Sequence, residues 1–330
     1  MEKIGVLGAG AWGTALAAAA AAAGRDTVLW AREAEVVDAI TKTHENTPFL
    51  PGVTLDPKLK ATGELSDLAD RDAILLVSPA QHLRTMVRDL KTYVPDGVPL
   101  VICSKGIEVA TGKLLSQAVA EEAPGNPVAV LSGPTFAIEV ARGLPCALTL
   151  ATEDKTIGMK LVEALGRPTF RPYYNADIVG AQIGGAVKNV LAIATGISAG
   201  LGVGENARAA VITRGLAEII RFGKLYGARE ETLMGLSGLG DLILTCSSTQ
   251  SRNMSLGKAI GEGQTLEEIM AGRRSVAEGA HTVEIVYKIA AEKKLDMPIT
   301  TAVYRILKEG KDVRQVMDDL MARPFTSENN

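Results

Sequence analysis

Three glycines near the start of the chain have the spacing of a phosphate-binding turn, in the segment GAGAWG at residues 8–13. In such a G-x-G-x-x-G segment, Gly8 allows a tight turn, Gly10 lets the backbone approach a pyrophosphate, and Gly13 lets a helix pack closely on a strand. The positive end of the following helix would face the phosphates. The sequence therefore predicts a dinucleotide site here, and the alternative is a strand-to-helix turn with a purely structural role.

A second chemical signal is the charged pair Arg32 and Glu33, which closely follows the apolar segment Asp26–Trp30. An acidic residue at the end of the second strand of a dinucleotide-binding unit holds the ribose 2′-hydroxyl of NAD, whereas an arginine suits the 2′-phosphate of NADP. Arg32 therefore favours NADP(H), while Glu33 leaves NAD(H) open. The alternative is that Arg32 is a solvated surface charge.

Two polar segments come directly after apolar runs, namely SKG at 104–106 and SGPT at 132–135. Open α/β sheets bind their ligands at the carboxyl ends of the strands, which is where both segments are expected. Lys105, flanked by a glycine, is placed to reach an anionic substrate. The alternative for Lys105 is an exposed lysine in a turn.

The segment GGAVKNV at 184–190 places a lysine inside an otherwise apolar helical stretch. Burial disfavours the charged form of Lys188 and lowers its pKa from about 10.4 towards neutrality, which makes a competent proton carrier. Gly184 and Gly185 each weaken a helix by roughly 1 kcal/mol relative to alanine, so another backbone or a ligand is expected close by. The alternative is a lysine whose charged end reaches solvent. No catalytic role is assigned to the three scattered histidines, His44, His82 and His281.

An acidic residue in a glycine-rich segment, LSGLGDL at 236–242, precedes the polar cluster SSTQSRN at 247–253. Asp241 is the expected partner that holds Lys188 in place. Arg252 and Asn253 are expected to grip a phosphate, because arginine binds phosphate oxygens with two parallel hydrogen bonds. The alternative is a helix-capping aspartate followed by a solvated loop.

These side chains need a framework, and the first half of the chain predicts a parallel sheet. The β-branched run Lys3–Leu7 leads into the glycine turn, the alanine- and leucine-rich stretch Thr14–Ala23 is a strong helix former, and Asp26–Trp30 is a second strand. Further apolar runs, separated by polar helix-compatible stretches, predict more strands at Ala73–Val77, Leu100–Cys103, Val128–Leu131 and Ala147–Leu150. This alternation is typical of a doubly wound α/β sheet of Rossmann type.

The second half has apolar residues at spacings of three and four, which predicts helices. These helices are expected at Val179–Ala199, Ala207–Tyr226, Thr265–Ala271, Thr282–Glu292 and Thr301–Lys308. We therefore expect an α/β fold with two domains. Residues 1–178 form a dinucleotide-binding Rossmann domain, and residues 179–330 form an all-α substrate-binding and catalytic domain.

Composition excludes several classes of protein. The net charge of −3, from 35 basic and 38 acidic residues, provides no overall field that attracts nucleic acid or an anionic membrane. Three widely spaced cysteines have no metal-ligand spacing, so no metal is expected and the thiols are expected to be reduced. We expect no membrane span and a cytoplasmic protein.

Seven short segments together resemble the bacterial NAD(P)+ glycerol-3-phosphate dehydrogenases. Each segment alone is weak evidence for this family, whereas seven segments in the same order over nearly the whole chain are specific for it. They are GAGAWGTALA (8–17), SKG (104–106), SGPTFA (132–137), GGAVKN (184–189), GLGDL (238–242), QSRN (250–253) and VAEG (276–279).

The resemblance implies the reversible interconversion of dihydroxyacetone phosphate and sn-glycerol 3-phosphate, running towards glycerol 3-phosphate for phospholipid synthesis. It implies that Lys188 is the general acid/base and that Asp241 is its supporting carboxylate. The substrate contacts that it implies are Lys105, Gly133, Thr135, Lys188, Asn189, Asp241, Ser251, Arg252 and Asn253. The cofactor contacts that it implies are Gly8, Gly10, Ala11, Trp12, Gly13, Arg32, Lys105, Ala137, Arg252, Val276 and Glu278.

Members of this family often carry serine, and tyrosine or phenylalanine, where this chain has Ala11 and Trp12, and their strand-end basic residue varies. These departures leave the choice between NADH and NADPH open. NADPH is the expected cofactor because of Arg32, with NADH possible, and family habit implies a homodimer. One alternative is another two-domain dehydrogenase acting on a hydroxyacid or a sugar acid, which the QSRN segment does not support. The other is a non-catalytic redox sensor that binds a dinucleotide, which would not need Lys188 beside Asp241.

Overall fold

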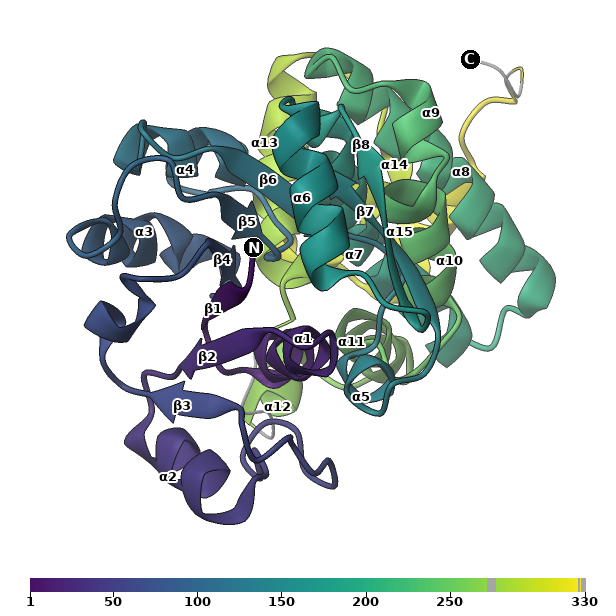
Figure 1. The fold of residues 1–330 in the computed structure, drawn as a ribbon. Helices are drawn as coiled ribbons and strands as arrows, with labels where there is room; N and C mark the ends of the chain where they lie inside the picture. Colours follow the sequence, from purple (N-terminus) through teal and green to yellow (C-terminus); the bar gives the residue numbers. More distant parts are fainter. Residues whose placement is uncertain (272–276, 326, 328–330) are drawn as a thin grey trace.

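The computed structural model describes residues 1–271, 277–325 and 327. The first half of the chain forms a sheet with helices, and the second half is helical (Figure 1). The expected fold class, a Rossmann-type sheet followed by an all-α part, is confirmed.

The sheet has eight strands in the order β3-β2-β1-β4-β5-β6-β7-β8. Its first six positions have the strand order of the doubly wound dinucleotide-binding fold. All neighbouring strands are parallel except β6 and β7, which are antiparallel. The strands are β1 (Lys3–Leu7), β2 (Asp26–Trp30), β3 (Lys60–Thr62), β4 (Ala73–Leu76), β5 (Leu100–Ile102), β6 (Val128–Ser132), β7 (Cys146–Ala151) and β8 (Phe170–Asn175).

Two of these strands, β3 and β8, were not predicted from the sequence. β3 has only three residues, none of them fully buried, so it has no apolar pattern. β8 contains Pro172, which weakens a strand prediction, and β8 lies at the end of the sheet, where proline is tolerated. The antiparallel β6–β7 pair also modifies the all-parallel sheet that we expected.

Different helices cover the two faces of the sheet. Leu16 and Leu161, from α1 and α6, belong to the apolar cluster on one face, and Val87 and Val119, from α3 and α4, belong to the cluster on the other. The helices of this half are α1 (Ala11–Ala22), α2 (Ala34–Thr43), η1 (Leu65–Leu68), η2 (Ala80–His82), α3 (Leu83–Lys91), α4 (Leu115–Glu122), α5 (Ala137–Ala141) and α6 (Lys155–Leu165).

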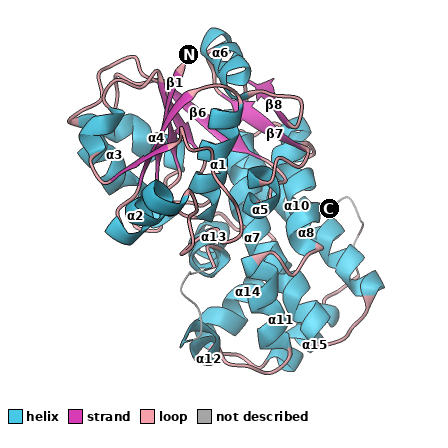
Figure 2. Cartoon of the chain, turned by 60° about the horizontal axis from the view of Figure 1, so that its bottom comes forward, coloured by secondary structure: helices cyan, strands magenta, loops and turns pink. Residues whose placement is uncertain are grey.

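The helical half gathers on one side of the sheet, with α11, α12, α14 and α15 farthest from the strands in Figure 2. η3 is a π-helical turn, and the other elements are α-helices. They are α7 (Ile178–Gly200), α8 (Glu205–Leu225), α9 (Glu230–Leu233), η3 (Leu236–Gly240), α10 (Asp241–Cys246), α11 (Arg252–Gly261), α12 (Leu266–Ala271), α13 (Gly279–Glu292), α14 (Pro298–Glu309) and α15 (Val313–Met321).

α7 is the central helix, and every residue from Gly180 to Ile197 is buried. Among the described helices, α7 is the one long and apolar enough to cross a membrane, but 89% of its apolar window is buried inside the protein. Ala181 belongs to the cluster on the sheet, whereas Ile183 belongs to the core of the helical half. α7 therefore packs into both cores, and the boundary at residues 178/179 stays a prediction.

Candidate active site

Backbone conformation and close packing explain why two positions of the turn between β1 and α1 are glycine, but neither explains the third, Gly10. Gly8 has a φ of +115°, and a Cβ added at Gly13 would lie 1.8 Å from the Gly8 carbonyl oxygen. A Cβ added at Gly10 would meet no described atom within 4 Å, and no described side chain caps the N-terminus of α1. Open space in front of free backbone N–H groups therefore fits the pyrophosphate of a dinucleotide.

Two further groups lie around this turn. Trp12, in the first turn of α1, has a buried indole Nε1 with no hydrogen-bond partner among the described residues. Arg32 and Glu33, just beyond β2, form an ion pair of 2.8 Å, and the Arg32 side chain is 77% exposed. The two charges that could discriminate NADP from NAD thus bind each other in the structure.

At the carboxyl end of the sheet, one buried carboxylate binds two lysines from different halves of the chain. Oδ1 of Asp241, in α10, lies 2.7 Å from Nζ of Lys188, in α7. Oδ2 of Asp241 lies 2.5 Å from Nζ of Lys105, which follows β5. Nζ of Lys105 also donates to the Gly133 carbonyl oxygen at 3.2 Å, and Nζ of Lys188 bonds to Oγ1 of Thr245 at 2.6 Å. The structure therefore brings together Lys188 and Asp241, and adds Lys105 to the same cluster.

The glycines before Lys188 explain how these groups can meet. A Cβ added at Gly184 would lie 2.6 Å from the Ser237 carbonyl oxygen, so the glycine lets η3 approach α7. A Cβ added at Gly185 would lie 2.8 Å from Oγ of Ser132 and 3.4 Å from Cγ of Lys105. The two glycines thus admit another backbone and the stem of Lys105, and α10 then begins at Asp241.

Burial and charge set the protonation of this cluster. Burial is the main cause that lowers the pKa of Lys188 to about 8, helped by the positive charge of Lys105 and opposed by Asp241. Burial alone would raise the pKa of Asp241, but the two ammonium groups outweigh it and hold that pKa below its usual value. Asp241 is therefore a carboxylate near neutral pH, and Lys188 can gain or lose a proton there.

The polar cluster near residue 250 caps and begins α11, a helix that the sequence did not predict. Oγ of Ser251 accepts a hydrogen bond from the Met254 backbone N–H at 3.2 Å, which makes Ser251 the N-cap. Arg252, the first residue of α11, is exposed. An exposed arginine at the positive end of a helix is a fitting partner for a phosphate.

Both polar atoms of the Asn253 side chain bind other parts of the protein. Its Nδ2 donates to Oδ1 of Asn189 at 3.0 Å, and its Oδ1 accepts from the Gly279 backbone N–H at 3.0 Å. The contact is possible because α11 packs closely on α7, where a Cβ at Gly257 would lie 2.0 Å from the Ile193 carbonyl oxygen. The bond between Asn189 and Asn253 thus ties the N-terminus of α11 to α7, directly beside Lys188.

The other expected site residues lie on segments at the same edge of the sheet. Gly133 follows β6 with a φ of +157°, and its carbonyl oxygen accepts a hydrogen bond from Oγ1 of Thr135 at 3.2 Å. Ala137 begins α5. Burial raises the pKa of Glu278, although Arg252 and the Ala80 backbone N–H both lower it. Val276 lies outside the described residues.

Sequence reasoning missed one residue and one pairing. Thr245 was not considered, although it lies four residues after Asp241 and therefore on the same helix face. Lys105 was expected only to reach a ligand, and its ion pair with Asp241 has no sequence signal across 136 positions. Among the residues that the structure describes, no group of three or more His, Cys, Asp or Glu could hold a metal ion.

Comparisons with known proteins agree with this geometry. Family models described as the N-terminus and the C-terminus of NAD-dependent glycerol-3-phosphate dehydrogenase match residues 3–158 and 177–318. The chain is 56% identical to the glycerol-3-phosphate dehydrogenase, NAD(P)+ type, of Parvibaculum lavamentivorans, over 99% of this chain and 98% of that protein. It is 54% identical to the protein of the same name from Rhodospirillum rubrum, over 99% and 94%. A crystal structure of glycerol-3-phosphate dehydrogenase from Coxiella burnetii superposes with a TM-score of 0.93 at 40% identity, over 98% and 99% of the two chains.

Proposed function

The chain belongs to the NAD-dependent glycerol-3-phosphate dehydrogenase family, and from that premise we propose that it interconverts dihydroxyacetone phosphate and sn-glycerol 3-phosphate. It is an NAD(P)-dependent oxidoreductase. The observation that carries the proposal is the Asp241 carboxylate, which binds Lys188 and Lys105 at the sheet edge where open α/β folds bind ligands.

Lys188 is the general acid and base of the proposed reaction. The bound nicotinamide supplies the hydride that reduces the carbonyl carbon. The Lys188 ammonium then protonates the oxygen on which negative charge develops, and the neutral amine takes that proton back in the oxidative direction. Asp241 and Thr245 hold Nζ of Lys188 by bonds of 2.7 and 2.6 Å, so the proton donor is oriented before substrate binds.

Lys105 provides a second positive charge beside the same carboxylate. Its side chain is 19% exposed, whereas that of Lys188 is 7% exposed, so Lys105 is the more accessible of the two. We assign to Lys105 contact with the substrate oxygens and with the cofactor. Gly133 and Thr135, on the neighbouring strand end, complete this side of the substrate site.

The phosphate of the substrate is assigned to the N-terminus of α11. Arg252 supplies the charge, the first turn of α11 supplies backbone N–H groups, and Asn253 and Asn189 fix the helix against α7. Ser251 caps the same helix. Binding at the phosphate then holds the carbonyl in position, so that remote binding energy is used for orientation.

The cofactor is assigned to the glycine turn, with NADPH preferred over NADH because of Arg32. In the structure Glu33 forms an ion pair with Arg32, so the 2′-phosphate of NADPH must compete with the Glu33 carboxylate for the Arg32 guanidinium. The remaining assigned cofactor contacts are Gly8, Gly10, Ala11, Trp12, Gly13, Lys105, Ala137, Arg252, Val276 and Glu278.

Four broader expectations stay part of the proposal. Residues 1–178 form the dinucleotide-binding domain, and residues 179–330 form the helical substrate-binding and catalytic domain, with Lys105, Gly133 and Thr135 of the first domain completing the substrate site. The protein acts as a homodimer in the cytoplasm. Its product serves glycerophospholipid synthesis.

The test is an absorbance assay with purified protein, dihydroxyacetone phosphate and either NADPH or NADH. Oxidation of the nicotinamide, faster with NADPH, is the expected result. Turnover with a 2-keto acid or a keto sugar acid, and none with dihydroxyacetone phosphate, would instead favour the hydroxyacid or sugar-acid dehydrogenase. Cofactor binding without turnover of any of these substrates would favour the redox sensor.

A further inference from the structure

Lys105 lies at the start of a closed loop, residues 104–114, that joins β5 to α4. The Glu108 backbone N–H donates to the Lys113 carbonyl oxygen at 3.0 Å, and the Gly112 N–H donates to the Glu108 carbonyl oxygen at 2.8 Å. Ile107 and Leu114 also pair as an isolated antiparallel bridge. Residues 107–114 therefore form a loop with its own internal structure, and Lys105 lies just before it.

One side of the loop belongs to the helical half. Ile107 and Leu114 are buried in the apolar core of that half. A Cβ added at Gly112 would lie 3.7 Å from Cδ1 of Ile285, in α13. Apolar packing holds this side, but such packing is non-directional and does not by itself fix the position of Lys105.

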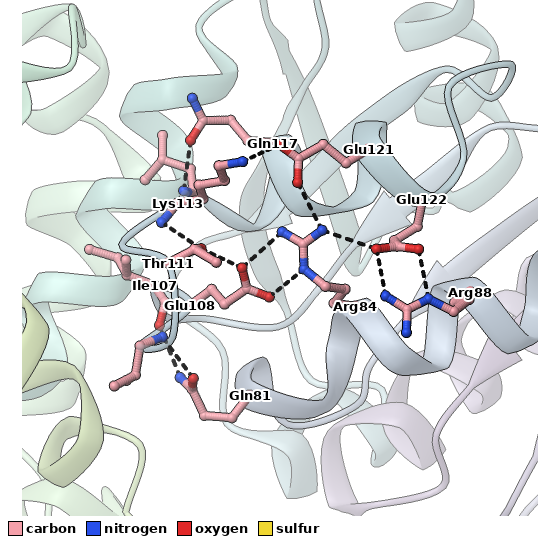
Figure 3. Close-up of polar contacts among 12 residues, drawn as sticks. Gln81, Arg84, Arg88, Ile107, Glu108, Thr111, Lys113, Gln117, Glu121 and Glu122 are labelled. Atoms are coloured by element: carbon pink, nitrogen blue, oxygen red, sulfur yellow. Dashed lines mark hydrogen bonds and ion pairs between the residues drawn. The ribbon is translucent and has the colours of Figure 1, made fainter.

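The other side of the loop is held by an arginine from α3. Nε and Nη2 of Arg84 donate to the two carboxylate oxygens of Glu108 at 2.7 and 2.9 Å (Figure 3). Nη1 of the same guanidinium donates to Glu121 at 2.8 Å and to Glu122 at 3.0 Å, both in α4. The Glu108 side chain is only 9% exposed, so this two-bond pair is largely shielded from solvent.

A glutamine three residues before Arg84 clamps the loop backbone. Nε2 of Gln81 donates to the Ile107 carbonyl oxygen at 2.9 Å, and its Oε1 accepts from the Val109 N–H at 2.9 Å (Figure 3). Between this clamp and Lys105 lies Gly106, where a Cβ would come within 2.8 Å of the Ala80 Cβ. The loop thus touches η2 directly from Gly106 onwards.

We infer that Gln81 and Arg84 are positioning residues, which fix the loop at residues 104–114 so that the Lys105 ammonium reaches Asp241. Neither side chain is assigned to the substrate or the cofactor; each acts through Lys105. The inference rests on the proposed function for its effect on catalysis, but its structural part concerns the loop alone.

The position of Lys105 has a consequence for the proton donor. The charge of Lys105 is one of the causes that lower the pKa of Lys188. If the loop loosens and Lys105 withdraws, the pKa of Lys188 should rise. The reductive rate should then persist to higher pH, which a general loss of stability would not produce.

The test compares Gln81→Leu and Arg84→Gln with the control Arg88→Gln. Arg88 lies in the same network but binds Glu122 of α4, and its side chain is 60% exposed. Gln81→Leu keeps every charge of the network and removes only the clamp. Lys105→Ala provides the reference for the pH shift.

We expect faster amide hydrogen exchange at residues 104–114 in both test variants. We also expect kcat to fall roughly 10- to 100-fold, the scale expected when a group in the active site is misplaced by about 1 Å. The fall of the reductive rate at high pH should move to higher pH, as in Lys105→Ala. All properties of Arg88→Gln should stay unchanged. Unchanged exchange and unchanged kcat in Gln81→Leu would overturn the inference, as would a fall in kcat with an unmoved pH limb. If the unmodified enzyme does not reduce dihydroxyacetone phosphate, the proposed function fails, while hydrogen exchange still decides whether the clamp orders the loop.

Discussion

Nζ of Lys105 and Oδ2 of Asp241 lie 2.5 Å apart, although the two residues belong to different halves of the chain. The first follows a strand of the sheet and the second begins α10 of the helical half. Because Asp241 also binds Lys188, the cluster of one carboxylate and two lysines is complete only when the halves are packed together.

Replacing the buried lysine should abolish most of the activity. Lys188→Ala is expected to lower kcat by at least about 100-fold, the low end for loss of a general acid. Steady-state oxidation of NADPH with dihydroxyacetone phosphate measures it. Lys258→Ala, which removes a half-exposed lysine of α11, is the matched control and should keep full activity. Near-normal turnover in Lys188→Ala would show that another group donates the proton.

The two reaction directions should depend on pH in opposite ways. Reduction needs the Lys188 ammonium, so its rate should fall as pH rises through about 8, the pKa of this group in the folded protein. Oxidation needs the neutral amine, so its rate should rise through the same pH. Asp241 raises the pKa of Lys188, and Asp241→Asn should therefore move both limbs to lower pH. Profiles of kcat that rise together in both directions would exclude Lys188 as the acid/base.

Removing the guanidinium at the start of α11 should weaken substrate binding. Arg252→Ala is expected to cost about 1.5–3 kcal/mol, the usual scale for a hydrogen bond to a charged group, which is roughly 10- to 150-fold in affinity. The KM for dihydroxyacetone phosphate measures this loss. Dihydroxyacetone, which lacks the phosphate, is the matched substrate and should be affected little. An equal effect on both substrates would place the phosphate elsewhere.

The charged pair beyond β2 should control the choice of cofactor. Arg32→Ala is expected to raise the KM for NADPH by roughly tenfold, the loss of one charge-assisted hydrogen bond, without changing that for NADH. Glu33→Gln should lower the KM for NADPH, because it frees the guanidinium from its 2.8 Å ion pair. Equal changes with the two cofactors would mean that Arg32 does not contact the 2′-phosphate.

A buried glutamate should make stability depend on pH. Glu218, in α8, accepts hydrogen bonds at 2.6 and 3.0 Å from the Ile299 and Thr300 backbone N–H groups at the start of α14, and one at 2.7 Å from the Thr300 hydroxyl. Burial raises its pKa from 4.5 to about 6. The stabilisation linked to the raised pKa is therefore fully present below pH 4.5 and is lost as pH rises through 6, which amounts to about 2 kcal/mol.

Glu218→Gln should remove this pH dependence. It should also lower the free energy of unfolding by about 1–3 kcal/mol at pH 4.5, where both side chains are neutral, because the single acceptor oxygen of the amide leaves a backbone N–H at the start of α14 unpaired. Urea unfolding at pH 4.5, 6 and 7 measures both effects. A variant whose stability changes with pH as the unmodified protein's does would contradict the assignment to Glu218.

Local signals in the sequence were sufficient for the fold class and for the cofactor class. The turn at residues 8–13 can be recognised because steric demands act within six residues, as shown by the 1.8 Å approach that a Cβ at Gly13 would make to Gly8. The apolar runs predicted β1, β2 and β4 to β7 because their residues are buried on both faces of the sheet. β8 was missed because Pro172 hides the pattern of an edge strand, and α11 because its start is a polar cluster.

The candidate site residues came from the sequence by motif and by resemblance, but their arrangement came from tertiary packing alone. Lys188 stands out in the sequence as a charge in an apolar helix, yet its pKa depends on Asp241 and Lys105, which lie 53 and 83 positions away. Electrostatic energy depends on distance in space and on burial, and neither is encoded within a local window. The glycines at 184 and 185 predicted that something would approach α7, and only the folded chain showed that η3 and the Lys105 stem do so.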